Sequence, residues 1–132
     1  MHSPPPLGAA VILPDTSVWV DHFRNRVADL ENLLHAEQVT IHALVVGELA
    51  LGTLPSRQKV LADLQDLPSV VTAQDYEVLQ LIHARSLHGL GLGYIDAHLL
   101  ASALLTPDTQ LWTRDKRLRA AAKQLNLDAG LA

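Results

Sequence analysis

The chain of 132 residues contains no cysteine. This absence excludes a disulfide framework, a zinc site built on thiolates and a cysteine nucleophile. It is also consistent with a reducing compartment, and we expect the protein in the cytoplasm.

Long apolar segments and excess positive charge are missing as well. The first apolar run, residues 9–13, is far shorter than the ~20 residues of a membrane-spanning helix and too short for a signal-peptide core. We therefore expect no membrane association. Ten Lys and Arg against fourteen Asp and Glu give a net charge of −4. A protein that holds nucleic acid by bulk electrostatics is basic, so any nucleic-acid function must depend on local chemistry.

Short apolar runs alternate with helical periodicity along the chain. The pattern predicts strands at residues 9–13, 38–41, 69–72 and 110–113, and leaves open a fifth after Asn126. It predicts helices at residues 15–23, 27–36, 43–51, 57–67, 74–87, 94–105 and 115–125. This alternation favours an α/β fold in which helices cover both faces of a parallel sheet of four to five strands. We expect a disordered lead at residues 1–8 and a single domain over residues 9–132.

Four acidic residues stand where such a sheet would gather them, because open α/β sheets bind ligands beyond the carboxyl ends of their strands. Asp15 and Asp115 directly follow predicted strands, although either one alone could serve only as a helix cap. Glu48 has apolar neighbours on its predicted helix, and no Lys or Arg lies within eight positions of it. Asp96 faces the same way as the apolar stripe of its own helix.

Convergence of these acids would call for a cation, because crowded carboxylates repel one another and take up protons. Ligands that are all oxygen suit Mg²⁺ or Mn²⁺. Such an ion activates water and neutralises charge on a phosphate, and two ions can hold the attacking and leaving oxygens. The cluster therefore predicts phosphodiester hydrolysis, with catalytic residues Asp15, Glu48, Asp96 and Asp115.

The segments around the acids resemble the PIN-domain family and, within it, the VapC-like toxins of bacterial toxin–antitoxin pairs. The similar segments are ILPDTSVW at residues 12–19, VGEL at 46–49, YIDAHLLA at 94–101 and LWTRD at 111–115, in the family's order. The resemblance extends from about residue 10 to residue 127. It implies a three-layer α/β/α fold, RNA cleavage that depends on Mg²⁺ or Mn²⁺, a homodimer, and inhibition by a VapB-like antitoxin.

Residue roles follow from position in the family's motifs. The resemblance implies that the principal metal ligands are Asp15 and Asp96, supported by Glu48 and Asp115. It implies hydroxyl groups that orient a water molecule or a phosphate at Thr16 and Thr113.

Basic residues gather near the last of the acids, with five of the ten between positions 114 and 123. Three of them flank Asp115 closely enough to hold an RNA backbone: Arg114, Lys116 and Arg117. The other interpretation of this group is a solvated helix face.

The same sequence gives less support to several other functions. No two of the seven histidines have the i, i+4 spacing of a zinc-protease pair. An aspartate-based phosphatase would carry a second aspartate two residues after Asp15, where this chain has Ser17. A receiver-type domain would place its aspartate directly after the third strand, whereas Asp75 falls at a helix start. A catalytically inactive PIN-like module that binds RNA or a partner would lack one of the four acids, and none is missing.

Overall fold

Two parallel strands, β1 (Val11–Pro14) and β2 (Thr109–Trp112), lie side by side at the centre of the computed structural model, which describes residues 10–132. Their register places Pro14 opposite Trp112, so both strands end at the same edge. The disordered lead predicted at residues 1–8 lies outside the described residues.

Single parallel bridges continue the pairing on both sides of these strands. Val39 bridges to Ile12, Ile41 to Ser69, and Leu111 to Asp128. The four to five strands expected from the sequence are not confirmed, because β1 and β2 alone form strands within residues 10–132. The segments that form only single bridges end there because of local features of the chain. The chain enters a helix cap directly after Ile41, and the proline before Ser69 has no N–H to donate to a ladder.

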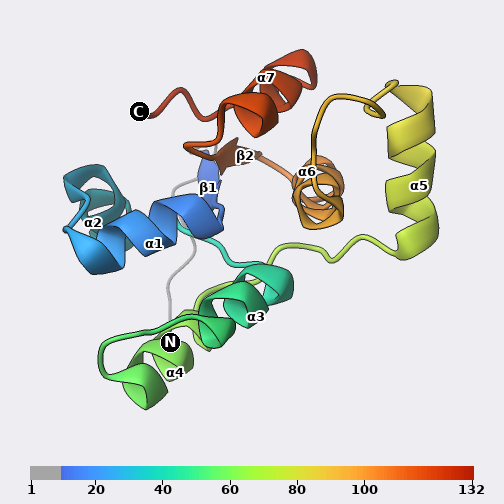
Figure 1. Cartoon of the computed structure of the whole chain (residues 1–132). Coiled ribbons are helices and arrows are strands. Elements are labelled where there is room, and N and C mark those ends of the chain that lie inside the picture. Colours follow the sequence, from blue (N-terminus) through green and yellow to red (C-terminus); the bar gives the residue numbers. More distant parts are fainter. Residues whose placement is uncertain (1–9) are drawn as a thin grey trace.

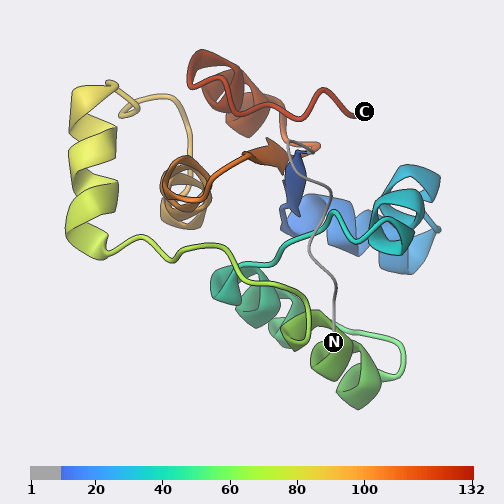
Figure 2. The same ribbon diagram turned by 180° about the vertical axis from the view of Figure 1, so that it is seen from behind.

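Helices surround the strands on several sides, as Figure 1 and the reverse view in Figure 2 show. α7 lies on one side of the strands, α6 on another, and α1 and α2 on the side away from α6. α5 packs on the outside of α6, and α3 packs against both α1 and α4. The α/β class with a parallel sheet is therefore confirmed. The helices are α1 (Thr16–Arg24), α2 (Ala28–His35), α3 (Ala43–Leu51), α4 (Arg57–Gln65), α5 (Asp75–Ala84), α6 (Tyr94–Leu105) and α7 (Lys116–Gln124).

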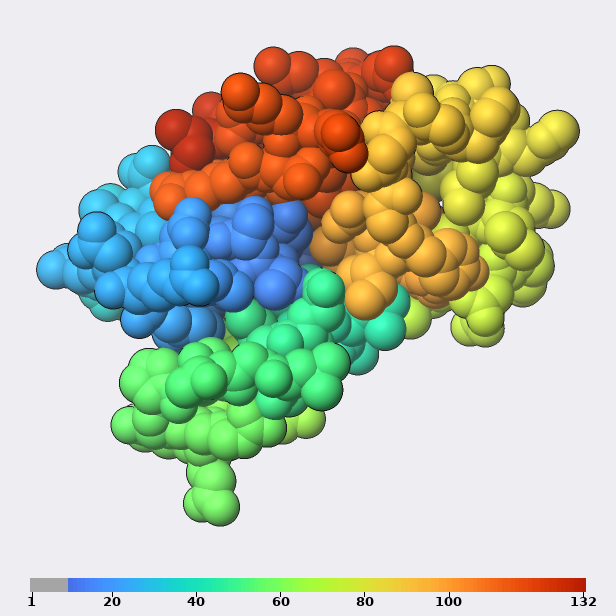
Figure 3. Space-filling view, in the orientation of Figure 1, coloured from blue at the N-terminus to red at the C-terminus, as the bar shows by residue number. Residues whose placement is uncertain are grey.

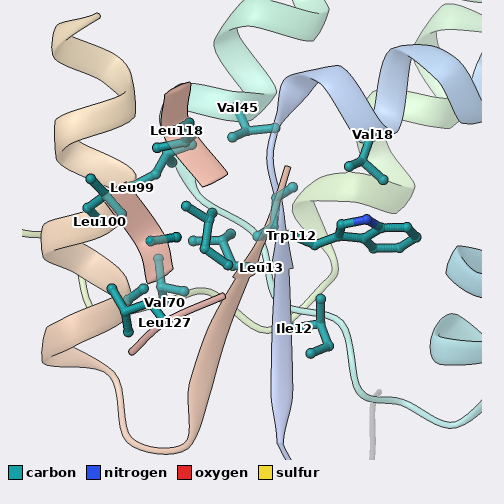
Figure 4. Close-up of a cluster of buried hydrophobic side chains, with 14 of the residues drawn as sticks. Ile12, Leu13, Val18, Val45, Val70, Leu99, Leu100, Trp112, Leu118 and Leu127 are labelled. Atoms are coloured by element: carbon teal, nitrogen blue, oxygen red, sulfur yellow. The ribbon is translucent and has the colours of Figure 1, made fainter. Parts of the chain in front are cut away.

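The hydrophobic core fills the space between the strands and the helices, where Leu13, Leu100 and Leu118 are fully buried (Figure 4). α6 is buried on every side through residues 97–103, since β2 contacts one face and α5 another. This burial explains why α6 lacks the polar face of an ordinary surface helix. The same packing fixes the position of the first turn of α6, which carries Asp96. No helix within residues 10–132 has the length and apolarity needed to cross a membrane.

Candidate active site

The carboxyl ends of β1 and β2 bring Asp15 and Thr113 together. The Asp15 amide donates a hydrogen bond of 2.9 Å to the Trp112 carbonyl, which extends the strand register by one residue. The Thr113 hydroxyl then donates to Oδ2 of Asp15 at 2.5 Å. Parallel pairing of the strands therefore places these two polar side chains in contact at the edge where the sequence predicted a site.

Asp15 is buried, and both of its carboxylate oxygens accept hydrogen bonds. Oδ1 accepts from the Ser17 hydroxyl at 2.5 Å and from the Val18 amide at 3.2 Å, so Asp15 also caps α1. Burial raises the pKa of the Asp15 carboxyl above its ordinary value, and the hydrogen bonds from Ser17, Thr113 and Val18 oppose that rise. The capping role is thus real, and it coexists with a position at the centre of the site.

Glu48 comes to the site on α3, which packs against α1. Its Oε1 accepts a 2.6 Å hydrogen bond from the Thr16 hydroxyl, the first residue of α1. Glu48 is half-buried, and within residues 10–132 it forms no ion pair with an arginine or lysine. The two threonine hydroxyls therefore hold two of the acids in place, Thr16 for Glu48 and Thr113 for Asp15.

Asp96 stands in the first turn of α6 and is half-buried. Its Oδ2 accepts a 3.3 Å hydrogen bond from the Gly93 amide. Burial raises the pKa of the Asp96 carboxyl, and the Gly93 hydrogen bond opposes the rise. Three negative charges raise this pKa further: those of Asp15, Asp115 and Glu48. Asp96 thus lies within electrostatic reach of all three other acids, although they are spread over a hundred positions of the chain.

Asp115 lies on the exposed rim of the cluster and caps α7, since its Oδ1 accepts from the Leu118 amide at 2.9 Å. Its own amide donates to the Thr113 hydroxyl oxygen at 3.0 Å. Thr113 thereby connects Asp115 to Asp15. Figure 3 shows the segments that carry the site meeting on one face: α1 in blue, α3 in green, and α6 and the segment after β2 in orange.

The donor set suits a hard divalent cation, because every candidate ligand is a carboxylate or hydroxyl oxygen. Three carboxylate oxygens accept no hydrogen bond from any described residue: Oδ1 of Asp96, Oε2 of Glu48 and Oδ2 of Asp115. However, among residues 10–132 no three acidic or histidine side chains are grouped closely enough to hold a metal ion as they stand. The residues fit Mg²⁺ or Mn²⁺ by the chemistry of their oxygen atoms. Their side chains would have to rotate for three of them to reach one ion.

The candidate RNA-binding residues differ in how they are used within the chain. The Arg114 guanidinium forms a 2.9 Å ion pair with Asp21 of α1, and the Arg114 amide donates to the Ser17 hydroxyl at 3.1 Å. Arg114 therefore ties the β2–α7 turn to α1. Lys116 and Arg117 are exposed in the first turn of α7.

Sequence reasoning missed two polar contacts that support the site. Ser17 binds Asp15, and the spacing of a serine two residues after an aspartate at a helix start could have indicated it. His42 caps α3 through Nδ1, which accepts from the Leu44 amide at 3.0 Å, and its Nε2 lies 3.1 Å from the Ser102 hydroxyl in α6. This buried pair links the helices that carry Glu48 and Asp96. Burial lowers the pKa of His42, and the charge of the neighbouring His98 lowers it further.

Comparison with known proteins agrees with this geometry. The family model of the PIN domain matches residues 12–124, and the chain belongs to the PIN-domain family. The chain is also similar to the proteins named Ribonuclease VapC32 of two strains of Mycobacterium tuberculosis, CDC 1551 / Oshkosh and H37Rv. Each is 46% identical to it over 114 residues, which are 86% of this chain and 92% of the relative.

Proposed function

We propose that this protein is a ribonuclease that hydrolyses RNA phosphodiester bonds at a divalent cation held by Asp15, Glu48, Asp96 and Asp115. The observation that carries the proposal is the set of contacts at the carboxyl ends of β1 and β2. Thr113 binds both Asp15 and the Asp115 amide, Thr16 next to Asp15 binds Glu48, and the charges of these three acids raise the pKa of Asp96 after the larger effect of burial. Like charges gathered at one place are unfavourable unless a cation offsets them. The similarity to proteins named ribonucleases supports RNA as the substrate.

In this proposal Asp15 and Asp96 are the principal ligands of Mg²⁺ or Mn²⁺, and Glu48 and Asp115 support them. The bound ion would supply positive charge for the phosphate and make a nearby water molecule more acidic. Thr113 and Ser17 keep the Asp15 carboxylate in one orientation, and Thr16 does the same for Glu48. Among the residues that the structure describes, Asp96 accepts one hydrogen bond, from Gly93, so its carboxylate can rotate toward the ion.

The test is cleavage of a labelled single-stranded RNA by the purified protein with Mg²⁺ or Mn²⁺ and with chelator. We expect cleavage that needs the ion and that Asp96→Asn abolishes. Asp29→Asn is the matched control, because it removes the same charge from an exposed position on α2. RNA binding without cleavage under every metal condition would contradict the nuclease proposal and favour an inactive RNA-binding module.

We further propose that the protein is the toxin of a VapBC-type pair, neutralised by a VapB-like antitoxin. A groove of about 350 Å³ between α1 and α4 supports a partner with an apolar segment, since its walls include Trp19, Phe23, Leu64 and Leu67. Expression of the chain alone should arrest growth, and co-expression of the antitoxin or Asp15→Ala should restore it. Growth arrest that persists in the Asp15→Ala variant would contradict a toxin that acts through the carboxylates.

Homodimerisation, cytoplasmic location and a fuller sheet belong to the same proposal. Exposed apolar side chains on the outer helices, Tyr76 and Leu79 on α5 and Leu104 on α6, offer a surface for a second copy. The single parallel bridges at Val39 and Asp128, one on each side of β1 and β2, support the proposal of a sheet of four to five strands. Light scattering of the wild type and of Leu79→Lys tests the dimer, and a monomeric wild type would contradict it.

A further inference from the structure

The basic residues near Asp115 divide into two groups by their contacts. Arg114 pairs with Asp21, and the Arg119 guanidinium donates to the Thr113 carbonyl at 2.8 Å and to the Leu131 carbonyl at 3.3 Å. Within residues 10–132, Lys116, Arg117 and Lys123 form no ion pair. Arg114 and Arg119 are thus occupied in holding the chain together, whereas no ion pair within the described residues occupies the other three. Lys116 and Arg117 stand in the first turn of α7 near Asp115, and Lys123 stands at its far end.

Arg117 differs from the two lysines because its side chain lies against the loop before α6, across Gly91. A Cβ atom at Gly91 would stand 2.8 Å from Nη1 and 2.9 Å from Cδ of Arg117, which is closer than a Cβ atom approaches another atom. These atoms belong to the flexible part of the Arg117 side chain, so a methyl group at Gly91 would displace the arm. Figure 3 shows this loop lying directly against α7. Gly91 also has a φ of 79°, a left-handed conformation that glycine adopts readily.

Gly89 shows that the contact is specific to one glycine of this loop. Its φ is 72°, so it needs glycine for the same conformational reason. Yet nothing lies within 4 Å of the place where its Cβ would stand. A side chain at Gly91 would therefore push the Arg117 arm aside, whereas a side chain at Gly89 would meet no atom.

The same loop connects Arg117 to the carboxylate cluster. Gly93 follows Gly91 by two residues, so their Cα atoms are at most about 7 Å apart. The Gly93 amide donates to Asp96, and Asp115 caps the helix on which Arg117 stands. Arg117 thus stands in the first turn of the helix that Asp115 caps, with its arm over the loop that leads to Asp96, and within residues 10–132 it pairs with none of the acids.

We propose that Arg117, held against Gly91, binds a phosphate of the RNA backbone next to the site of cleavage. This inference rests on the proposed ribonuclease function and adds the residue that offsets the charge of the acids for the substrate. A chain with net charge −4 and four gathered carboxylates repels RNA, so a fixed cation at the rim has a large effect on binding. A guanidinium suits a phosphate because its N–H groups match two oxygens at once.

Placement against Gly91 also explains how one exposed arginine binds effectively. A long side chain normally loses conformational freedom when it binds, and this loss weakens the complex. The Arg117 arm already lies against Gly91 before RNA arrives, so in this proposal part of that freedom has been lost in advance. Gly91 is therefore a positioning residue in this proposal, and Arg117 is the residue that touches the substrate.

The experiment measures KM, kcat and the salt dependence of KM for cleavage of a single-stranded RNA oligonucleotide with Mn²⁺. Arg117→Gln should raise KM about tenfold with little change in kcat, and it should lower the slope of log KM against log salt by roughly 0.7, the value of one phosphate contact. The KM of Arg117→Lys should lie between that of the wild type and that of Arg117→Gln. Lys123→Gln is the matched control, since it removes an exposed positive charge from the far end of α7 and should change KM little.

Two glycine variants test the positioning of the arm. Gly91→Ala should raise KM by less than Arg117→Gln does, because the displaced arm keeps its charge. Gly89→Ala imposes similar backbone strain without reaching Arg117 and should leave KM near the wild-type value. The double variant Gly91→Ala/Arg117→Gln should be no worse than Arg117→Gln alone, because both changes remove one contact.

Distinct results overturn the inference and the function. If the wild type cleaves RNA while Arg117→Gln and Lys123→Gln share one KM and one salt slope, the phosphate contact is wrong and the ribonuclease stands. Equal effects of Gly91→Ala and Gly89→Ala would refute the positioning role. A wild-type protein that neither binds nor cleaves RNA with the ion would overturn both proposals.

Discussion

Asp15 and Asp96 occupy the two sides of the carboxylate cluster, and they carry their negative charge in different ways. Burial raises the pKa of both. Asp15 accepts three hydrogen bonds, from Ser17, Val18 and Thr113, and these donors oppose the effect of burial on its pKa without cancelling it. Asp96 accepts one long hydrogen bond, and the three other acids of the cluster oppose its charge.

The two acids therefore differ in what their side chains contribute to folding. Ser17, Val18 and Thr113 donate to Asp15, and the bond from Val18 caps α1, so loss of the Asp15 side chain removes several native contacts. Asp96 has one weak donor among the described residues and meets three like charges, so its charge should lower the stability of the metal-free chain. We therefore expect Asp15→Ala to lower the free energy of unfolding and Asp96→Asn to raise it.

The largest effect should follow from Asp15→Ala. This change removes a helix cap and leaves the Thr113 and Ser17 hydroxyls without their acceptor, which should lower the free energy of unfolding by about 2–4 kcal/mol. Activity should fall to background. Asp115→Ala, which removes an exposed cap of the same kind, should lower the free energy of unfolding by only about 1 kcal/mol. Urea denaturation measures both, and equal losses would contradict the anchoring role of Asp15.

Asp96→Asn should separate activity from stability. The amide keeps the hydrogen bond from Gly93 and removes the repelled charge, so the Tm of the metal-free protein should rise while cleavage falls by about 100-fold or more. Mn²⁺ should raise the Tm of the wild type and have little effect on the variant. Thermal unfolding with and without Mn²⁺ measures this, with Asp29→Asn as the control for an exposed acid. A lower Tm for Asp96→Asn would show that its charge is stabilised within the chain.

Thr113→Val tests the connection between the two strand ends. The change keeps the volume but leaves Oδ2 of Asp15 and the Asp115 amide without a partner, so activity should fall about 10-fold. Thr109→Val, on the same strand, removes a hydrogen bond to the Pro107 carbonyl and should leave activity unchanged. Cleavage rates of equal amounts of folded protein give the comparison. Similar rates for the two variants would mean that Thr113 acts only in packing.

The smallest effect concerns pH. A raised pKa means that folded Asp96 binds its proton more tightly than the unfolded chain does. The protonated group therefore adds to the free energy of unfolding below pH 3.8, its ordinary pKa, and this contribution is lost as the pH rises through the pKa of the folded state. The metal-free stability advantage of Asp96→Asn over the wild type should therefore grow from about pH 4 toward neutrality and then level off. Urea denaturation across this range measures it. A difference that is constant with pH would mean that the pKa of Asp96 is not raised.

Local sequence patterns predicted much of this molecule. The periodicity at residues 43–51 and 94–105 gave both limits of α3 and α6, since a helix end depends on residues within one turn. Strand limits were less accurate. The segments at residues 38–41 and 69–72 have the apolar character of strands but form only single bridges, because pairing depends on neighbours far away in the chain.

The four acids could be singled out from the sequence because a carboxylate after a strand or beside apolar residues needs a reason to be there. The long-range hydrogen bonds that support these acids could not be predicted from the sequence. The Thr16–Glu48 hydrogen bond spans 32 positions and the Thr113–Asp15 bond spans 98. Nor did the sequence distinguish Arg114, which pairs with Asp21, from Arg117, which lies on Gly91.

The sequence by itself determined where the helices run, that Asp15 and Asp115 stand at helix starts and which four acids form the candidate site, because periodicity and capping act over a few neighbouring residues. The tertiary structure alone decided which carboxylate is held by donors, which one meets only like charge, and which arginine remains available. Those outcomes depend on the packing of α1, α3, α6 and α7 around two strand ends, and contacts across such distances leave no local pattern in the chain.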